Sequence, residues 1–210
     1  MALMRGREWY TLEEYYALEE TSEERHEFYE NEIYAMAGGS ANHNRITRNL
    51  TVALTQELSG KPCEAFVNDL RLRLERVGLH TYPDVMVVCG GLTYAAGRSD
   101  EIVNPTLIAE VLSPSTEAYD RGRKFEWYRT LESFQEYLLL DQNRRYVEHY
   151  RRGVEEEWTL RVYHQPDEVI HLDSIGVEVP LEELYQRVDW ESTQENGMNA
   201  GSEGPPRPAG

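Results

Sequence analysis

The spacing of hydrophobic positions along the chain predicts a protein built from both helices and strands. Apolar residues recur every three or four positions at Ile46, Leu50 and Leu54, and this period is typical of an amphipathic helix. Thr11 and Glu14 have the spacing of a capping box, which marks the start of another helix. Helices are therefore expected over residues 12–19, 42–58, 115–131 and 181–185.

Other segments show the two-residue alternation or the short apolar runs that are typical of strands. A hairpin within residues 26–37 is expected to turn at Glu30 and Asn31. Further strands are expected over residues 63–68, 70–75, 82–88, 107–112, 136–141, 144–150, 158–163 and 169–172. This order of elements predicts an α/β (α+β) fold in which helices flank a mixed β-sheet. The sequence has neither a GxGxxG nor a GxxxxGK pattern, so a doubly wound nucleotide-binding fold is not expected.

Length and composition bound the organisation of the chain. Its 210 residues are enough for one sizeable domain, which is expected to span residues 1–190. Residues 191–210 are polar and then rich in glycine and proline, so they are expected to form a disordered tail. The sequence contains no apolar stretch of membrane-spanning length and no signal-peptide pattern. A cytoplasmic protein without a membrane partner is therefore expected.

The two cysteines give no indication of a metal site. Cys63 and Cys89 lie in apolar, strand-like runs, and their spacing is not that of metal ligands. We interpret them as reduced core residues, with a disulfide between them as the less favoured alternative.

The charge of the chain limits the partners that it can have. The formal net charge of −17 argues against broad, nonspecific binding to DNA, which depends on a cationic surface. Basic residues nevertheless gather in two later stretches, at Arg121, Arg123, Lys124 and Arg129 and at Arg144, Arg145, Arg151 and Arg152. An acidic protein with a local basic patch can accept a phosphate substrate where its geometry fits.

Two acidic residues lie within runs that are expected to be buried strands. Asp84 belongs to the run over residues 82–88, and Glu110 belongs to the run over 107–112. A buried carboxylate is costly unless it is paired, neutralised or bound to a metal. A single aspartate after a proline is more typical of a turn, but the combination of Asp84 with Glu110 favours a cation site.

Short motifs that follow one another over residues 10–150 give a more specific indication. In chain order they are Arg25-His26-Glu27-Phe28, Ala35-Met36-Ala37-Gly38, His43, Asn68-Asp69-Leu70-Arg71, Tyr82-Pro83-Asp84-Val85, Glu110-Val111-Leu112-Ser113-Pro114-Ser115-Thr116, Asp120, Lys124 and Tyr128. Their order and spacing resemble the Uma-type family of restriction endonucleases, in the PD-(D/E)xK nuclease superfamily. The resemblance implies a restriction-endonuclease-like fold and nuclease activity.

The position of the lysine departs from the superfamily pattern. A lysine usually stands two residues after the second acid, and Leu112 occupies that place here. The resemblance implies that Lys124, on the following helix, has taken over its role. Asp120, Lys124 and Tyr128 are spaced at four-residue steps and are expected on one helical face. The alternative for Lys124 is an ordinary surface lysine.

The resemblance and the chemistry of the residues together assign roles. Asp84 and Glu110 are expected to hold Mg²⁺, for which Mn²⁺ can substitute, with the Val111 carbonyl as a further oxygen ligand. Lys124 is expected to orient the attacking water or to stabilise the transition state. Glu27 matches a further acid of the family and is expected to complete the metal shell, with a solvated surface position as an equal alternative.

The function that follows is a metal-dependent endonuclease that hydrolyses phosphodiester bonds in DNA, acting as a homodimer. One alternative is a binding or scaffold module that keeps the nuclease fold without turnover, and the displaced lysine and the acidic charge favour it. A second alternative is a metal-dependent hydrolase of small phosphate compounds. His43 is interpreted as a capping or packing residue outside the catalytic set.

Overall fold

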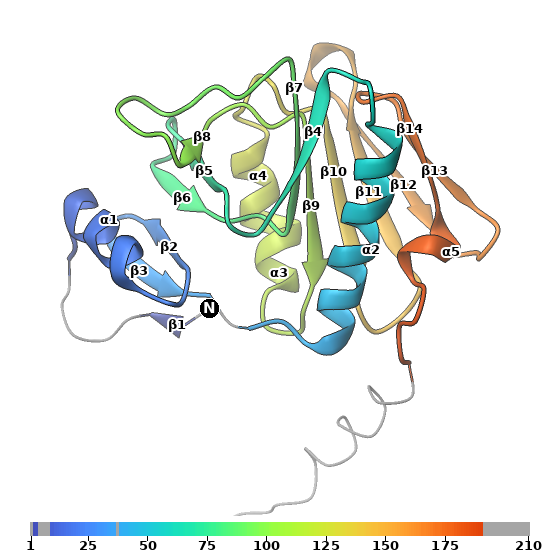
Figure 1. Ribbon diagram of the computed structural model, residues 1–210, viewed down its shortest axis with the longest axis horizontal. Coiled ribbons are helices and arrows are strands. Elements are labelled where there is room, and N and C mark those ends of the chain that lie inside the picture. The colour runs from blue at the N-terminus through green and yellow to red at the C-terminus, as the bar shows by residue number, and fades with distance from the viewer. Residues whose placement is uncertain (1, 4–8, 37, 191–210) are drawn as a thin grey trace, which may run out of the picture.

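The computed structural model describes residues 2–3, 9–36 and 38–190 (Figure 1). The tail expected over residues 191–210 lies outside the described residues. The helical elements are α1 (Leu12–Thr21), α2 (Ala41–Glu57), α3 (Glu117–Tyr119), the π-helical turn η1 (Asp120–Lys124), α4 (Phe125–Tyr128), the 3₁₀ turn η2 (Val154–Glu156) and α5 (Leu181–Leu184). No helix in the described part of the chain is long and apolar enough to cross a membrane.

The strands form two six-stranded sheets and a two-stranded ribbon. The first sheet has the order β1 (Ala2–Leu3), β3 (Glu32–Ala35), β2 (His26–Tyr29), β6 (Leu79–Thr81), β5 (Arg71–Leu74) and β8 (Glu101–Ile102). The second sheet has the order β12 (Trp158–Tyr163), β11 (Val147–Arg152), β10 (Glu136–Asp141), β9 (Leu107–Leu112), β7 (Val85–Cys89) and β4 (Cys63–Val67). The ribbon consists of β13 (Val169–Leu172) and β14 (Val177–Pro180).

The second sheet is buried on both faces, which explains the continuous apolar runs of its central strands. One face carries Val85, Val87, Ala109 and Val111 and packs into a core with residues of α2, α5 and the β13–β14 ribbon. The other face carries Met86 and Ile108 and shares a core with α4 and with strands β5 and β6 of the first sheet. Because successive side chains of a strand point to opposite faces, Glu110 lies on the α4 face together with Ile108.

Most of the elements expected from the sequence are confirmed. The hairpin turns at Glu30 and Asn31, which both have the positive φ angles of a tight hairpin turn. The Thr11–Glu14 capping box opens α1. The mixed sheet is confirmed in the parallel pairing of β9 with β10 and the antiparallel pairing of β9 with β7. The second six-stranded sheet was not expected.

The observed helical segment after β9 differs from the single helix predicted over residues 115–131. It begins as α3, widens into the π-turn η1 and returns to α-helical geometry in α4, which ends at Tyr128. A π-turn inserts an extra residue into a helical turn, and such turns are frequent at functional sites.

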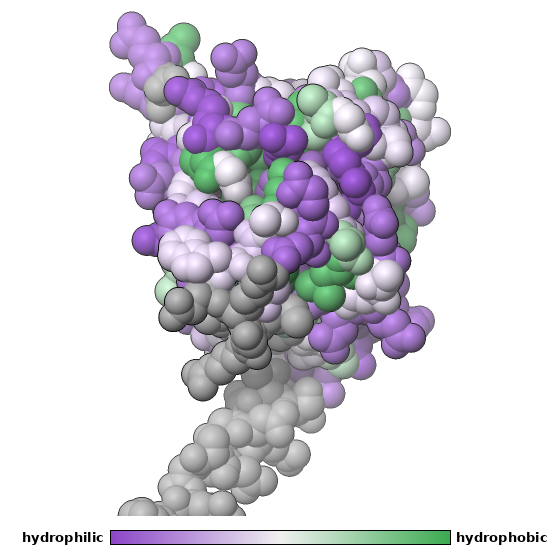
Figure 2. Space-filling model, turned by 90° about the vertical axis from the view of Figure 1, so that its left-hand side faces the viewer, coloured by the Kyte–Doolittle hydropathy of each residue, from purple (hydrophilic) through white to green (hydrophobic). Residues whose placement is uncertain are grey.

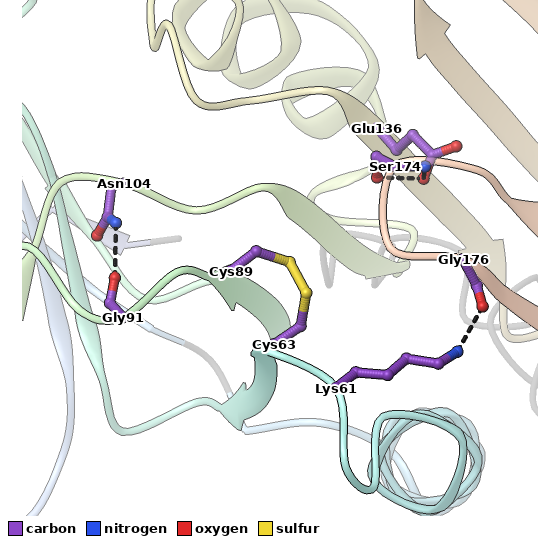
Figure 3. The surroundings of a disulfide bond; sticks show 8 residues. All are labelled: Lys61, Cys63, Cys89, Gly91, Asn104, Glu136, Ser174 and Gly176. Carbon is purple, nitrogen blue, oxygen red and sulfur yellow. Dashed lines mark hydrogen bonds between the residues drawn. A yellow bond between two sulfur atoms is a disulfide. The ribbon is translucent and has the colours of Figure 1, made fainter.

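The prediction of reduced cysteines is wrong for this structure, because Cys63 and Cys89 form a disulfide (Figure 3). They lie directly opposite each other on the antiparallel strands β4 and β7, so the register of the sheet brings their side chains together. The bond joins the edge strand β4 to the interior strand β7. On the chain just before β4, the Lys61 ammonium donates a hydrogen bond to the Gly176 carbonyl (Figure 3).

Candidate active site

The two acids singled out from the sequence lie side by side. Strands β7 and β9 are antiparallel, and Val85 is the register partner of Ala109, so Asp84 comes next to Glu110. The Asp84 backbone N–H donates to Glu110 Oε2 over 3.2 Å. In return, the Val111 N–H donates to Asp84 Oδ2 over 2.7 Å. These reciprocal bonds fix both carboxylates at the end of the β7–β9 pair.

Lys124 reaches the same place from the π-turn η1. Its Nζ lies 3.0 Å from Glu110 Oε1 and 3.5 Å from Asp120 Oδ1. Tyr128, one turn further along, donates its hydroxyl to Glu110 Oε1 over 2.9 Å. Asp120, Lys124 and Tyr128 are all buried, so they share one face as their spacing predicts. An ordinary surface position for Lys124 is thereby excluded.

Glu27 belongs to this cluster because its carboxylate contacts Lys124. Its Oε1 lies 3.1 Å from Lys124 Nζ, and it also accepts a hydrogen bond from the Thr81 hydroxyl. Tyr119 donates to Glu27 Oε2 over 3.2 Å. The side chain comes from β2 and is 1% exposed, so the solvated alternative for Glu27 is wrong.

His43 also reaches the site, which the sequence did not lead us to expect. The residue lies in the first turn of α2, and its Nε2 is 3.1 Å from Asp84 Oδ2. A helix-start histidine has no motif of its own. The available signal was its place directly after the Gly38–Gly39–Ser40 break, among the motifs that resemble the family.

The cluster strongly perturbs its ionisable groups. Burial raises the pKa of the Glu110 carboxyl to about 8; the charge of Lys124 opposes this rise, and the charges of Asp84 and Asp120 add to it. Burial works against the charged form of Lys124, but the charges of Glu110 and Glu27 outweigh it and hold the lysine pKa well above its usual range. Burial likewise opposes the charged imidazole of His43, yet its hydrogen bond to Asp84 and that carboxylate's charge raise its pKa.

These residues line a cleft of about 810 Å³. Its carboxylates are Glu24, Glu27, Asp69, Asp84, Glu110 and Asp120. Among the described lining residues, the cations opposite them are Arg25 and Lys124, together with the titratable His43. The excess of negative charge at the bottom of a cleft is the electrostatic setting that a bound cation offsets.

The donor atoms in the cleft fit a hard divalent cation with few protein ligands. Within the described ranges, no three histidine, cysteine, aspartate or glutamate side chains form a ready metal shell. Mg²⁺ does not need one, because it is commonly held by one or two carboxylates and keeps several waters. Asp84 and Glu110 supply two adjacent carboxylates, and Val111 lines the cleft beside them. Glu27 contacts the lysine rather than Asp84 in this arrangement.

Of the eight basic residues in the two stretches, Lys124 is the one that lines the cleft among the described residues, and three others, one of them Arg151, are paired with acids elsewhere. Arg121 contacts Glu148 and Glu117, and Arg144 contacts Asp141. The basic stretches therefore do not form a continuous cationic surface at the cleft.

Comparisons with known proteins show the family of this chain. A family model named Uma2 and described as "Putative restriction endonuclease" matches residues 12–182. The chain belongs to this family. Its membership confirms the resemblance that the motifs indicated, and the matched range contains all of the site residues described above.

Two proteins of Synechocystis sp. are similar to this Uma2-family chain. "Uncharacterized protein sll1609" is 43% identical over 150 residues, which cover 71% of this chain and 85% of that protein. "Uncharacterized protein slr1290" is 36% identical over 174 residues, which cover 83% and 90% respectively.

A solved structure shares the fold of this Uma2-family chain. It is that of "a putative nuclease belonging to DUF820" from Anabaena variabilis ATCC 29413, with a TM-score of 0.68. The match covers 83% of this chain and 97% of that one, at 18% sequence identity. The likeness confirms the restriction-endonuclease-like α+β fold.

Proposed function

We propose that this protein is a metal-dependent endonuclease that hydrolyses phosphodiester bonds in DNA, with Mg²⁺ as its cofactor and Mn²⁺ as a substitute. The observation that carries the proposal is the place of Lys124. Its ammonium lies 3.0 Å from Glu110 although it comes from the helix after β9 rather than from the strand itself. The two acids and the lysine of the PD-(D/E)xK pattern thus meet at the base of one cleft.

In this proposal Asp84 and Glu110 hold the cation, with the Val111 carbonyl as a further ligand. When bound, the cation makes a coordinated water more acidic and offsets charge on the phosphate. The arrangement of the two acids across β7 and β9 is set by backbone hydrogen bonds, so the pair is positioned before any ligand arrives.

Lys124 supplies the positive charge that the reaction needs at the phosphate. Three carboxylates lie within 3.5 Å of its Nζ, and they hold it as an ammonium. An ammonium donates hydrogen bonds and cannot take a proton from water, so we assign Lys124 to orienting the water and stabilising the transition state. Glu27 and Asp120 place the lysine, because both contact its Nζ.

One observation favours a second candidate function, a binding module without turnover. Both oxygens of Glu110 already accept hydrogen bonds, Oε1 from Lys124 and Tyr128 and Oε2 from the Asp84 N–H. A cation must compete with these donors. The net charge of −17 further weakens attraction to DNA.

A DNA-nicking assay separates these functions. Supercoiled plasmid is incubated with the wild type in Mg²⁺ or Mn²⁺, with a chelator, and with the Asp84→Ala variant. The endonuclease proposal predicts relaxed and linear DNA only for the wild type with metal. Binding of DNA without nicking supports the inactive module, and hydrolysis of a small phosphodiester without nicking supports the small-phosphate hydrolase.

We further propose that the enzyme acts as a homodimer. Each chain has one such cleft, and cutting both strands of a duplex favours a two-fold arrangement of two clefts. On the face shown in Figure 2, the described residues are mainly hydrophilic, with apolar side chains in small separate areas. Light scattering that gives a monomer mass with and without DNA would contradict the dimer.

A further inference from the structure

His43 and Val111 both contact the same carboxylate oxygen of Asp84. The His43 Nε2 lies 3.1 Å from Asp84 Oδ2, and the Val111 N–H donates to Oδ2 over 2.7 Å. A carboxylate only accepts, so the proton between the two side chains belongs to the imidazole, and Nε2 is the donor. Within the described part of the chain, no hydrogen bond engages the other oxygen, Oδ1.

The imidazole is itself held in place by the start of α2. Ser40 caps the helix by accepting a hydrogen bond from the His43 backbone N–H over 3.1 Å. The Ser40 hydroxyl donates to the Gln142 side chain, whose amide donates to the Leu112 carbonyl over 2.9 Å. This chain of bonds ties the first turn of α2 to the end of β9, the strand that carries Glu110.

Gly39 packs against the other side of the ring. A Cβ at this position would lie 2.7 Å from His43 Nδ1, closer than real contacts allow. Only a glycine leaves the imidazole where it is, between the backbone of residue 39 and Asp84. A Cβ at Gly38 would meet nothing within 4 Å.

We propose that His43 is a positioning residue of the metal site, which holds Asp84 Oδ2 so that Oδ1 is available to the cation. The inference rests on the proposed function, because Asp84 is a metal ligand only in that proposal. Two donors on one oxygen stop the carboxylate from rotating about its Cβ–Cγ bond, so the orientation needed for binding exists before the cation arrives. Partners of this kind commonly change metal affinity about 10- to 100-fold.

The first test compares two substitutions of His43 by Mn²⁺ titration calorimetry at constant pH. His43→Ala leaves only the Val111 N–H on Oδ2, and Mn²⁺ affinity is expected to fall about 10-fold or more. In His43→Gln the amide nitrogen can take the place of Nε2 and donate without titrating, and affinity is expected to stay within a few fold of wild type. A purely structural role would lower the melting temperature of both variants without this difference in affinity.

The second test moves the ring without removing it. Gly39→Ala places a methyl group against Nδ1 and is expected to weaken Mn²⁺ binding in the same direction as His43→Ala. Gly38→Ala, on the neighbouring residue with open space around it, is the matched control and is expected to bind Mn²⁺ like the wild type.

The outcomes separate this inference from the proposed function. If the wild type binds no Mn²⁺ and nicks no DNA, the proposed function fails and the inference fails with it. If the wild type does both, but His43→Ala and Gly39→Ala bind Mn²⁺ as tightly as the wild type, only the inference is overturned. Equal losses in His43→Ala and His43→Gln also overturn it, because the donated hydrogen bond would then not be the cause.

Discussion

Two clusters of charged side chains among the described residues differ in their surroundings, because one faces a cleft and the other does not. The cleft cluster consists of Glu27, Asp84, Glu110, Asp120 and Lys124. The second, which we term the hairpin cluster, lies between α1 and the first sheet and consists of Glu19, His26, Arg71, His80 and Glu101. None of the residues of the hairpin cluster lines the cleft.

The hairpin cluster is balanced, because each carboxylate oxygen has its own donor. Glu101 accepts from His80 over 2.6 Å and from the Tyr16 hydroxyl over 2.9 Å. Glu19 accepts from His26 over 2.8 Å and from the Tyr82 hydroxyl. Such saturated buried carboxylates anchor a fold.

The cleft cluster is unbalanced, since three carboxylates contact one lysine and a fourth, that of Asp84, lies beside Glu110. Burial raises the pKa of Glu110, and the charges of Asp84 and Asp120 add to the rise. An oxygen of Asp84 has no donor among the described residues. The comparison teaches that a buried charge alone does not indicate a site. An excess of charge of one sign at the base of a cleft does indicate a functional site.

The largest effect is expected from removing the cation of the cleft cluster. Lys124→Ala should lower the rate of nicking about 100-fold or more, because a lost transition-state contact reduces turnover. Mn²⁺ affinity should not fall, since the lysine is not a ligand and its bond to Glu110 competes with a cation. Lys124→Arg should not restore cleavage, because a planar guanidinium does not fit a site shaped for an ammonium.

The chain provides a matched control for this substitution. Its one other lysine, Lys61, is exposed and contacts the Gly176 carbonyl outside the cleft. Lys61→Ala should cleave like the wild type. Cleavage by Lys124→Ala at the wild-type rate would remove Lys124 from the mechanism and leave Glu27 and Lys61 to be tested.

The same substitution in each cluster should have different effects on stability. Glu101→Gln breaks a balanced network and should lower the free energy of unfolding by about 3 kcal/mol. Glu110→Gln replaces an acid whose raised pKa already favours its neutral form, so it should cost less in metal-free protein. Urea denaturation of both variants at pH 6, where Glu110 is neutral, measures the difference, and equal losses would show that the two clusters are alike.

The pH dependence of stability should also distinguish the clusters. The Glu110 pKa is raised from its ordinary value near 4.5 to about 8, so the folded state holds this proton more tightly than the unfolded state. The stability that Glu110 contributes is therefore fully present below its unfolded pKa and is lost as the pH rises through about 8.

Urea titrations of metal-free wild type and Glu110→Gln at pH 5 and pH 8.5 test this sign. The wild type should lose stability relative to Glu110→Gln as the pH rises. A difference between the two proteins that does not change with pH would contradict the assignment.

The smallest effect is expected from Asp84→Asn. The asparagine side-chain oxygen can still accept from the Val111 N–H and from His43, while one negative charge leaves the crowded site. The melting temperature of the metal-free protein should therefore stay the same or rise. A loss of several degrees would instead make Asp84 a structural anchor.

The acids and their strands could be predicted from sequence because each signal is local. The apolar runs predict burial in strands. Glu110 is buried within β9, whereas Asp84 lies one residue before β7 and its side chain is 13% exposed. Antiparallel pairing still makes the two residues neighbours. The resemblance to the nuclease family assigned Lys124 to the site. Its spacing from Asp120 and Tyr128 already indicated that the three residues share one face of a helix.

Other features depend on contacts that no local pattern encodes. The disulfide requires the register between β4 and β7, and strands as short as β6 and β8 have too few residues to show a period. The contact of His43 with Asp84 joins the start of a helix to the start of a strand distant in sequence.

The central claim is that Asp84 and Glu110 form a divalent-cation site, and Mn²⁺ titration calorimetry tests it most directly. Asp84→Ala is compared with Asp69→Ala, which removes an acid from the exposed rim of the same cleft, where the side chain is 81% exposed. The account predicts Mn²⁺ binding to the wild type and to Asp69→Ala, and its loss in Asp84→Ala. The same binding isotherm for the wild type and Asp84→Ala would contradict the account.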